Sequence, residues 1–116
     1  MNMNNLEIAN QLVTVLEDKK AENILLMDIQ GIASFADYFI FASGTSDRML
    51  RALSESVKDS ADRVPGVRVR QEGSPDNGWV VVDCGDVVVH LFSPTQRDYY
   101  RLEELWDKGK VIVQLQ

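Results

Sequence analysis

The chain has 116 residues, of which 45% are hydrophobic and 26% are charged, a composition typical of a single globular domain. Eighteen Asp and Glu residues outnumber twelve Lys and Arg residues, and the net charge of −6 disfavours binding to nucleic-acid phosphates but allows a basic protein partner. Because it has one cysteine, Cys84, and its hydrophobic runs are too short to span a bilayer, we expect a cytoplasmic protein without a disulfide or a membrane contact.

The first third of the sequence predicts one helix followed by two buried strands. Asn4 or Asn5 is expected to cap a helix that ends near Lys20, because its apolar residues recur at helical spacing. Residues 23–29 form an almost continuous apolar run, which is typical of a central strand covered on both faces. Residues 38–42 predict a second strand that is again almost wholly apolar.

A turn after the second strand opens another helix, which is expected to end near Arg63 with Thr45 or Ser46 as its N-cap. The turn is also a candidate anion site, because backbone N–H groups at a helix start can bind phosphate. A capped helix start is the simpler interpretation, since the chain has no Asp-x-Asp or Glu-x-Glu pair of acids that could hold a metal ion for nucleotide chemistry. The four turn residues are Ser43, Gly44, Thr45 and Ser46.

The next elements are expected to be an edge strand, a turn and a hairpin. Residues 67–71 alternate between apolar and basic side chains, which predicts a short strand with one wet face at a sheet edge. Residues 72–78 are rich in turn formers. Residues 79–83 and 86–92 then predict a β-hairpin around the two-residue turn Cys84-Gly85.

That hairpin register places six side chains on one face, because strand residues alternate between faces. The opposite face is entirely aliphatic, so we interpret the mixed face as a candidate protein-binding patch with an aromatic anchor. Its tryptophan and histidine are expected to be partly exposed, because polar rings without partners are costly in a closed core. The alternative is that a helix covers this face. The six residues, in facing pairs, are Trp79 with His90, Val81 with Val88, and Asp83 with Asp86.

The two carboxylates of the patch have two interpretations. Asp83 and Asp86 are either turn residues or negative charges that meet Lys or Arg on a basic partner. A metal site formed with His90 is disfavoured, because four residues of extended strand separate it from Asp86 by roughly 13 Å. We therefore expect no metal ion, no cofactor and no catalytic residue, and we expect a structural role for Cys84.

A last helix is expected to begin after Ser93, with a proline at its first position and Gln96 completing a capping box. It is expected to end at Gly109 and to pack through an apolar stripe, and Tyr100 of the same helix is expected to reach the candidate patch. Residues 111–115 form an apolar tail that is either a docked strand or partly disordered and that could contact a second copy of the chain. The stripe consists of Tyr99, Leu102, Leu105 and Trp106.

The predicted order of elements indicates one α/β domain of the α+β type over residues 1–116. We expect a mixed sheet of about five strands with flanking helices. The core is expected to span residues 6–108, with a short apolar C-terminal tail over 111–116.

Three segments form a pattern whose combination and spacing are specific, although each segment alone is short. They are residues 37–46 (DYFIFASGTS), the pair Glu72-Gly73 followed by residues 79–90 (WVVVDCGDVVVH), and the pattern Arg97-x-x-Tyr100-x-Leu102-Glu103-x-Leu105-Trp106. The pattern resembles the ribosomal silencing factor family, also called the iojap family, over about residues 6–108.

The resemblance implies a nucleotidyltransferase-like fold without transferase activity. It implies binding to the large ribosomal subunit through ribosomal protein fourteen, which would block joining of the small subunit and lower translation when nutrients are scarce. It also implies a cytoplasmic location in bacteria and a homodimer when the protein is free. Two alternatives stay open: a large-subunit assembly factor that does not block initiation, or a nucleotide-binding enzyme of nucleotidyltransferase type.

Overall fold

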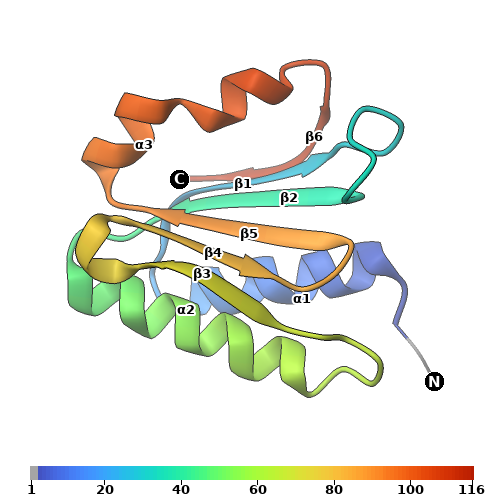
Figure 1. The fold of residues 1–116 in the computed structure, drawn as a ribbon, viewed down its shortest axis with the longest axis horizontal. Coiled ribbons are helices and arrows are strands. Elements are labelled where there is room, and N and C mark those ends of the chain that lie inside the picture. The colour runs from blue at the N-terminus through green and yellow to red at the C-terminus, as the bar shows by residue number, and fades with distance from the viewer. Residues whose placement is uncertain (1–2) are drawn as a thin grey trace.

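The computed structural model describes residues 3–116, apart from the side chains of residues 105 and 106. It consists of one six-stranded sheet with helical segments on both faces (Figure 1). The strands are β1 (Glu22–Asp28), β2 (Tyr38–Ser43), β3 (Arg70–Ser74), β4 (Trp79–Asp83), β5 (Val87–Phe92) and β6 (Lys110–Leu115). The helices are α1 (Asn5–Asp18), α2 (Asp47–Asp62) and α3 (Pro94–Tyr100), with 3-10 turns η1 (Pro75–Asn77) and η2 (Leu102–Trp106).

The strands lie in the order β3-β4-β5-β2-β1-β6. Neighbouring strands are antiparallel except β2 and β5, which are parallel. The observed sheet is therefore mixed, as predicted, with one strand more than the expected five.

Helices α1 and α2 cover one face of the sheet and form the larger core with it (Figure 1). Asn4 caps α1 in a complete capping box, because its side chain accepts from the Glu7 backbone N–H (2.8 Å) and its own N–H donates to the Glu7 carboxylate (3.0 Å). Ser46 caps α2 by accepting from the backbone N–H of Met49 (3.0 Å). The predicted apolar stripe of α2 is fully buried: Leu50, Leu53, Val57 and Ala61.

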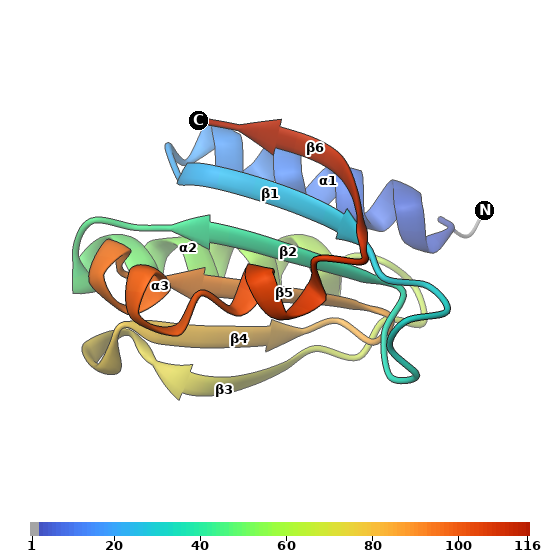
Figure 2. The same ribbon diagram turned by 90° about the horizontal axis from the view of Figure 1, so that it is seen from above.

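The opposite face of the sheet is only partly covered. Figure 2 shows α3 and η2 crossing above β2 and β5, with β3 left bare at one edge. A smaller core lies beneath them, and strand alternation divides β1 between the two cores, with Leu26 in the larger and Met27 in the smaller. The prediction that this strand is covered on both faces is thus confirmed. We call this smaller cluster the second core; its buried hydrophobic residues in the described part are Met27, Ile29, Ala36, Phe39, Phe41, Val88 and Phe92.

The edge strand lies three residues later than predicted, because β3 covers Arg70–Ser74 instead of residues 67–71. The expected turn at 72–78 shortens to η1 and the left-handed residue Gly78. Gly73 explains why β3 stays paired with β4 over residues that were expected to form the turn. A Cβ atom at this residue would lie 2.3 Å from the carbonyl oxygen of Trp79, so only glycine allows β3 to approach β4 this closely.

The hairpin of β4 and β5 turns one residue later than predicted. Its two-residue loop is Gly85-Asp86, because the backbone N–H of Cys84 donates to the carbonyl of Val87 (2.9 Å). Gly85 has φ +87°, a conformation that glycine adopts without strain and that a cysteine at the first loop position would not. The loop therefore follows the glycine and not the Cys84-Gly85 pair.

This displacement changes every facing pair by two residues but keeps the faces of the hairpin. The predicted pairs Trp79 with His90, Val81 with Val88, and Asp83 with Asp86 are wrong. The observed pairs are Trp79 with Phe92, Val81 with His90, and Asp83 with Val88. An even shift preserves alternation, so five of the six predicted side chains still share one face. Asp86 leaves it for the loop, where its carboxylate accepts from Asn5 of α1 (3.2 Å).

The predicted last helix is interrupted. α3 ends at Tyr100, Arg101 adopts a left-handed conformation (φ 47°), and η2 follows. The predicted capping box is half formed: the Ser93 hydroxyl accepts from the Gln96 backbone N–H (3.2 Å), but the Ser93 N–H donates to the carbonyl of Gly78 (2.9 Å). Tyr99 is 78% exposed and so lies outside the packed stripe, whereas Leu102 packs on the second core. Leu105 and Trp106 have side chains outside the described part.

The C-terminal tail docks as strand β6, antiparallel to β1, which decides between the two predicted alternatives. Val111 and Ile112 are exposed on this outer edge of the sheet, and a dimer contact there stays a prediction. Among the described residues, no helix has the length and hydrophobicity needed to cross a membrane.

Candidate functional site

Two hollows lie side by side on the partly covered face of the sheet, and Trp79, Val81 and Glu72 line both. Their volumes are about 390 and 360 Å³. We call them together the aromatic groove. Residues of β3, β4, β5 and β2 line it from the sheet, and residues of the α3–η2 segment form the opposite wall. Besides the three shared residues, the groove is lined by Gly73, Asn77, Gln96 and Tyr100 in the first hollow, and by Phe35, Phe39, Asp83, Val88, His90 and Leu102 in the second.

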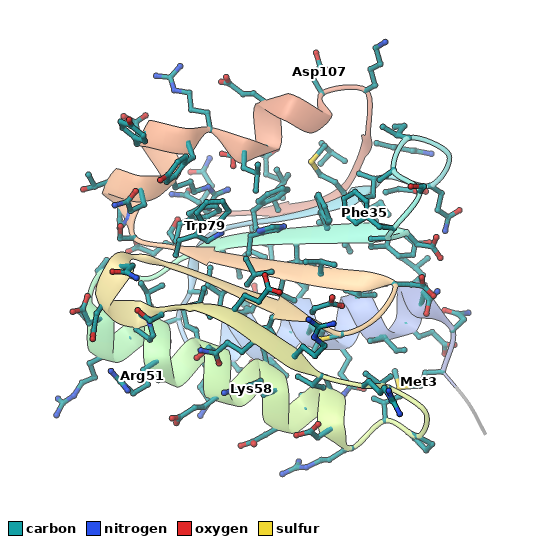
Figure 3. The ribbon with its side chains drawn as sticks, in the orientation of Figure 1. Met3, Phe35, Arg51, Lys58, Trp79 and Asp107 are labelled. Atoms are coloured by element: carbon teal, nitrogen blue, oxygen red, sulfur yellow. The ribbon has the colours of Figure 1, made fainter. Side chains whose placement is uncertain are left out.

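Trp79 stands at the centre of the aromatic groove. It is the first residue of β4 and lies between the sheet and the α3–η2 segment (Figure 3). Its ring stacks on Phe92 of β5 with centroids 5.1 Å apart, and Tyr100 of α3 contacts it at 4.9 Å. Trp79 stays partly exposed in spite of these contacts. The indole is therefore packed on two sides and partly exposed in the groove, whereas its ring nitrogen is buried with no hydrogen-bond partner among the described residues.

The wall of the groove comes from the two residues that flank the helix break. Tyr100 ends α3, is 47% exposed and reaches Trp79, as the sequence predicted. Leu102 begins η2 and lines the second hollow. The break at Arg101 turns the chain so that both side chains face the groove.

Phe35 is a groove residue that the sequence analysis missed. It lies on the loop between β1 and β2, is 59% exposed, and lines the second hollow opposite Trp79 (Figure 3). Its ring lies 5.8 Å from that of Phe39, a residue of the second core. A large apolar side chain in a loop, outside any periodic element, was the available signal.

His90 is buried, with 7% of its surface exposed, so the expectation of a partly exposed histidine is wrong. It lies in β5 between Phe41, stacked at 5.2 Å, and Phe39, edge-on at 4.9 Å. Within the described part of the chain, neither ring nitrogen has a hydrogen-bond partner. Burial therefore lowers the pKa of His90 to about 4 and keeps the ring neutral at pH 7.

The acidic rim of the groove also differs from the prediction. Asp83 lines the second hollow, and its carboxylate accepts from the Gly85 backbone N–H (2.8 Å), so it serves the turn while facing the groove. Glu72 of β3 lines both hollows and forms an exposed ion pair with Arg70 (3.7 Å). The carboxylates of the rim are thus Glu72 and Asp83, because Asp86 lies in the hairpin loop.

The two valines of the predicted patch support both interpretations of that face. Val88 is buried in the second core, as expected if other elements cover the face. Val81 is only partly buried and lines both hollows. On this face of the sheet, the boundary between the part buried under other elements and the exposed part therefore lies between β5 and β4.

The candidate anion site has most of its polar groups engaged within the protein. The buried Ser43 hydroxyl accepts from Arg97 (3.0 Å), and the Ser46 hydroxyl caps α2. The Thr45 N–H contacts the sulfur of Met49 (3.3 Å). A Cβ atom on Gly44 would lie 3.1 Å from Leu50, so this turn is packed closely on α2. Anion binding here stays a prediction.

Two further features of the described titratable groups concern metal binding and the single cysteine. Among the described residues, no cluster of three or more His, Cys, Asp or Glu side chains is placed to hold a metal ion. Cys84 is buried, and burial raises the pKa of its thiol to about 12, which suppresses the reactive thiolate. The groove is thus an aromatic hollow bordered by the carboxylates of Glu72 and Asp83, with the Arg70 guanidinium beside that of Glu72.

Comparison with known proteins gives consistent matches over nearly the whole chain. The model of the family described as "Ribosomal silencing factor during starvation" matches residues 2–116. Ribosomal silencing factor RsfS of Bacillus subtilis is 44% identical over 105 residues, which are 90% of this chain and 88% of that protein. A crystal structure of a Chromobacterium violaceum protein superimposes with a TM-score of 0.85 at 39% identity, covering 90% of this chain and 88% of that one. A mouse protein named "Mitochondrial assembly of ribosomal large subunit protein 1" is 34% identical over an alignment of 104 positions, which covers 84% of this chain and 44% of that protein.

Proposed function

Because the chain belongs to the ribosomal silencing factor family, we propose that it is a translational repressor that binds the large ribosomal subunit through ribosomal protein fourteen. Bound there, it occupies the surface that meets the small subunit and prevents the two subunits from joining. Such repression requires affinity and bulk, so we assign the chain a cytoplasmic role without catalysis, cofactor or metal ion.

The aromatic groove is the observation that carries this proposal. Trp79, Tyr100 and Phe35 present partly exposed rings on the half of the sheet that the chain's own helices leave open. Large aromatic side chains in preformed hollows are the usual anchors of protein–protein interfaces. An exposed apolar surface of this kind is costly in a free monomer unless a partner covers it.

The charge of the protein fits a basic partner. The whole chain carries a net charge of −6, and Glu72 and Asp83 border the groove. Opposite charges at the rim of an interface accelerate encounter and fix orientation more than they add affinity. We therefore assign binding energy to the aromatic groove and the rate of encounter to the acidic rim.

Steric exclusion needs only an interface of ordinary size. An interface that buries roughly 1,600 Å² in total, with a central aromatic anchor, supports affinities from micromolar to picomolar. A protein held on the joining surface with such affinity competes directly with the small subunit. The degree of repression then follows the concentration of the repressor relative to its dissociation constant.

Co-sedimentation with purified subunits tests the proposal. The protein should pellet with isolated large subunits and not with isolated small subunits, and its addition should lower the yield of joined ribosomes. The matched control is Val82→Ala, since Val82 is buried on the α1–α2 face, away from the groove. Equal binding to both subunits, or tight binding to protein-free ribosomal RNA, would refute the proposal.

The mouse relative's name supports a second candidate function, assistance in assembling the large subunit. The two functions make different predictions for mature subunits. A pure assembly factor leaves the joining of purified mature subunits unchanged, and its loss leads to accumulation of incomplete large subunits. A joining assay and a sucrose-gradient profile of cells lacking the protein therefore distinguish them.

A further inference from the structure

The α3–η2 segment forms one wall of the aromatic groove, yet few of its described side chains are buried. No residue of α3 is buried, and Tyr99 and Tyr100 are both exposed. Of the described side chains in η2, Leu102 is the one that packs on the second core. Among the described side chains of the segment, Leu102 therefore supplies the apolar contact with the second core, and Arg97 adds polar contacts with the sheet.

Arg97 attaches the segment to the sheet from the side opposite the groove. Its side chain is 13% exposed and faces a separate polar hollow of about 410 Å³. The guanidinium donates to the backbone carbonyl of Asn23 and to the hydroxyl of Ser43 (3.0 Å). These acceptors lie at the start of β1 and at the end of β2, so one side chain connects α3 to two neighbouring strands.

The same guanidinium also holds η2. Its Nε lies 3.2 Å from a carboxylate oxygen of Glu103, and the other Glu103 oxygen is buried with no partner among the described residues. Arg97 precedes the break at Arg101, and Glu103 follows it. The pair therefore fixes the angle between α3 and η2, and with it the positions of Tyr100 and Leu102 on either side of the break.

We propose that Arg97 is a positioning residue for the partner-binding groove: it holds Tyr100 against Trp79 and Leu102 over the second hollow, without touching the partner itself. This inference rests on the proposed function of the groove. A planar guanidinium suits the role, because it places several N–H donors in fixed directions toward three acceptors at once. The larger core lies on the far face of the sheet and does not depend on this attachment.

The test is Arg97→Met, which keeps the length of the side chain and removes all its donors. Affinity for isolated large subunits should fall by about tenfold, the effect expected when a charged hydrogen-bonding group that orders a binding wall is lost. The far-ultraviolet circular dichroism should stay like that of the wild type. The control is Arg63→Met, which removes the same charge from an exposed side chain at the end of α2, on the opposite face of the sheet, that lines neither hollow of the groove; it should bind like the wild type.

The indole N–H resonance of Trp79 supplies a readout that does not depend on the ribosome. In a Trp106→Phe background, where Trp79 gives the one indole signal, Arg97→Met should shift this resonance as Tyr100 moves away, and Arg63→Met should not. If Arg97→Met melts below the assay temperature, Arg97→Lys keeps the charge but loses the planar fork, and it should weaken binding and shift the resonance in the same direction.

Wild-type affinity in folded Arg97→Met, or an unchanged indole resonance, would overturn the positioning role. Equal losses of affinity in Arg97→Met and Arg63→Met would also overturn it, because net charge would then suffice as the cause. A wild-type protein that fails to bind large subunits would instead refute the proposed function, and the resonance would still decide whether Arg97 positions the wall.

Discussion

Burial of His90 predicts that the protein loses stability in mildly acidic solution. His90 is the single histidine of the chain and lies among the rings of Phe39, Phe41 and Phe92. Its pKa is lowered from 6.5 to about 4 by burial. The unfolded chain therefore binds a proton between pH 6.5 and 4 that the folded protein excludes. The contribution of the neutral His90 to the free energy of unfolding is complete above pH 6.5 and is lost as the pH decreases toward 4.

The magnitude follows from the size of this shift. A pKa difference of about 2.5 units corresponds to about 3 kcal/mol once the pH is below both values. At pH 5, where the unfolded histidine is almost fully protonated and the folded one is not, the expected loss is about 2 kcal/mol. This is a large part of the stability of a small domain, which is usually 5–15 kcal/mol.

Urea denaturation at pH 7.5 and at pH 5 measures this loss, with His90→Phe as the control. Phenylalanine fills a similar volume in the same aromatic surroundings and has no proton to exchange. The free energy of unfolding should fall by about 2 kcal/mol more in the wild type than in His90→Phe over this interval. Titration of carboxylates contributes equally to both proteins and cancels. Equal pH dependence of the two proteins would show that His90 is accessible to protons in the folded state, contrary to the structure.

Three further predictions concern the groove and its edges. Phe35→Ser should weaken binding to large subunits and leave the melting temperature nearly unchanged, because the ring is mostly exposed; a melting temperature lowered by many degrees would contradict this. Glu72→Gln combined with Asp83→Asn should slow association in stopped flow and reduce its salt dependence, since charges at an interface rim are screened within about 8 Å at physiological ionic strength; Asn keeps the oxygen that accepts from Gly85. Gly73→Ala should cost at least about 2 kcal/mol of folding free energy in denaturant titrations, because φ is +77° and a Cβ atom would clash with the Trp79 carbonyl; wild-type stability would refute that assignment.

Local sequence patterns predicted the elements of the fold well. Capping at Asn4, Ser46 and Ser93 was recognisable, because a cap depends on residues within one turn of each other. The faces of the hairpin were also predicted, since alternation survives an even shift in register. The exact pairing was not, because it depended on which of two adjacent residues adopts a positive φ at the loop, and the conformation of Gly85 decided it.

Features that leave no mark in the local sequence, or that depend on distant parts of the chain, could not be predicted. The break at Arg101 is of the first kind, because no glycine or proline marks it. The Arg97 contacts reach acceptors 54 and 74 residues earlier in the sequence. Burial of His90 depends on β2 pairing with β5, which places two phenylalanines beside the ring. The nucleotidyltransferase-like character of the fold stays a prediction.

The central claim is that the aromatic groove binds ribosomal protein fourteen. It is tested most directly by the affinity of the isolated ribosomal protein for three forms of the chain: the wild type, Trp79→Ala and Val82→Ala. Calorimetry at a temperature where all three are folded should show a loss of about 2–4 kcal/mol for Trp79→Ala, which is about thirty-fold to nearly a thousand-fold in dissociation constant. Val82→Ala removes methyl groups from the opposite, buried face, so it should lower stability and keep the affinity. Full affinity in folded Trp79→Ala, or the same loss in both variants, would contradict the assignment of the aromatic groove as the binding surface.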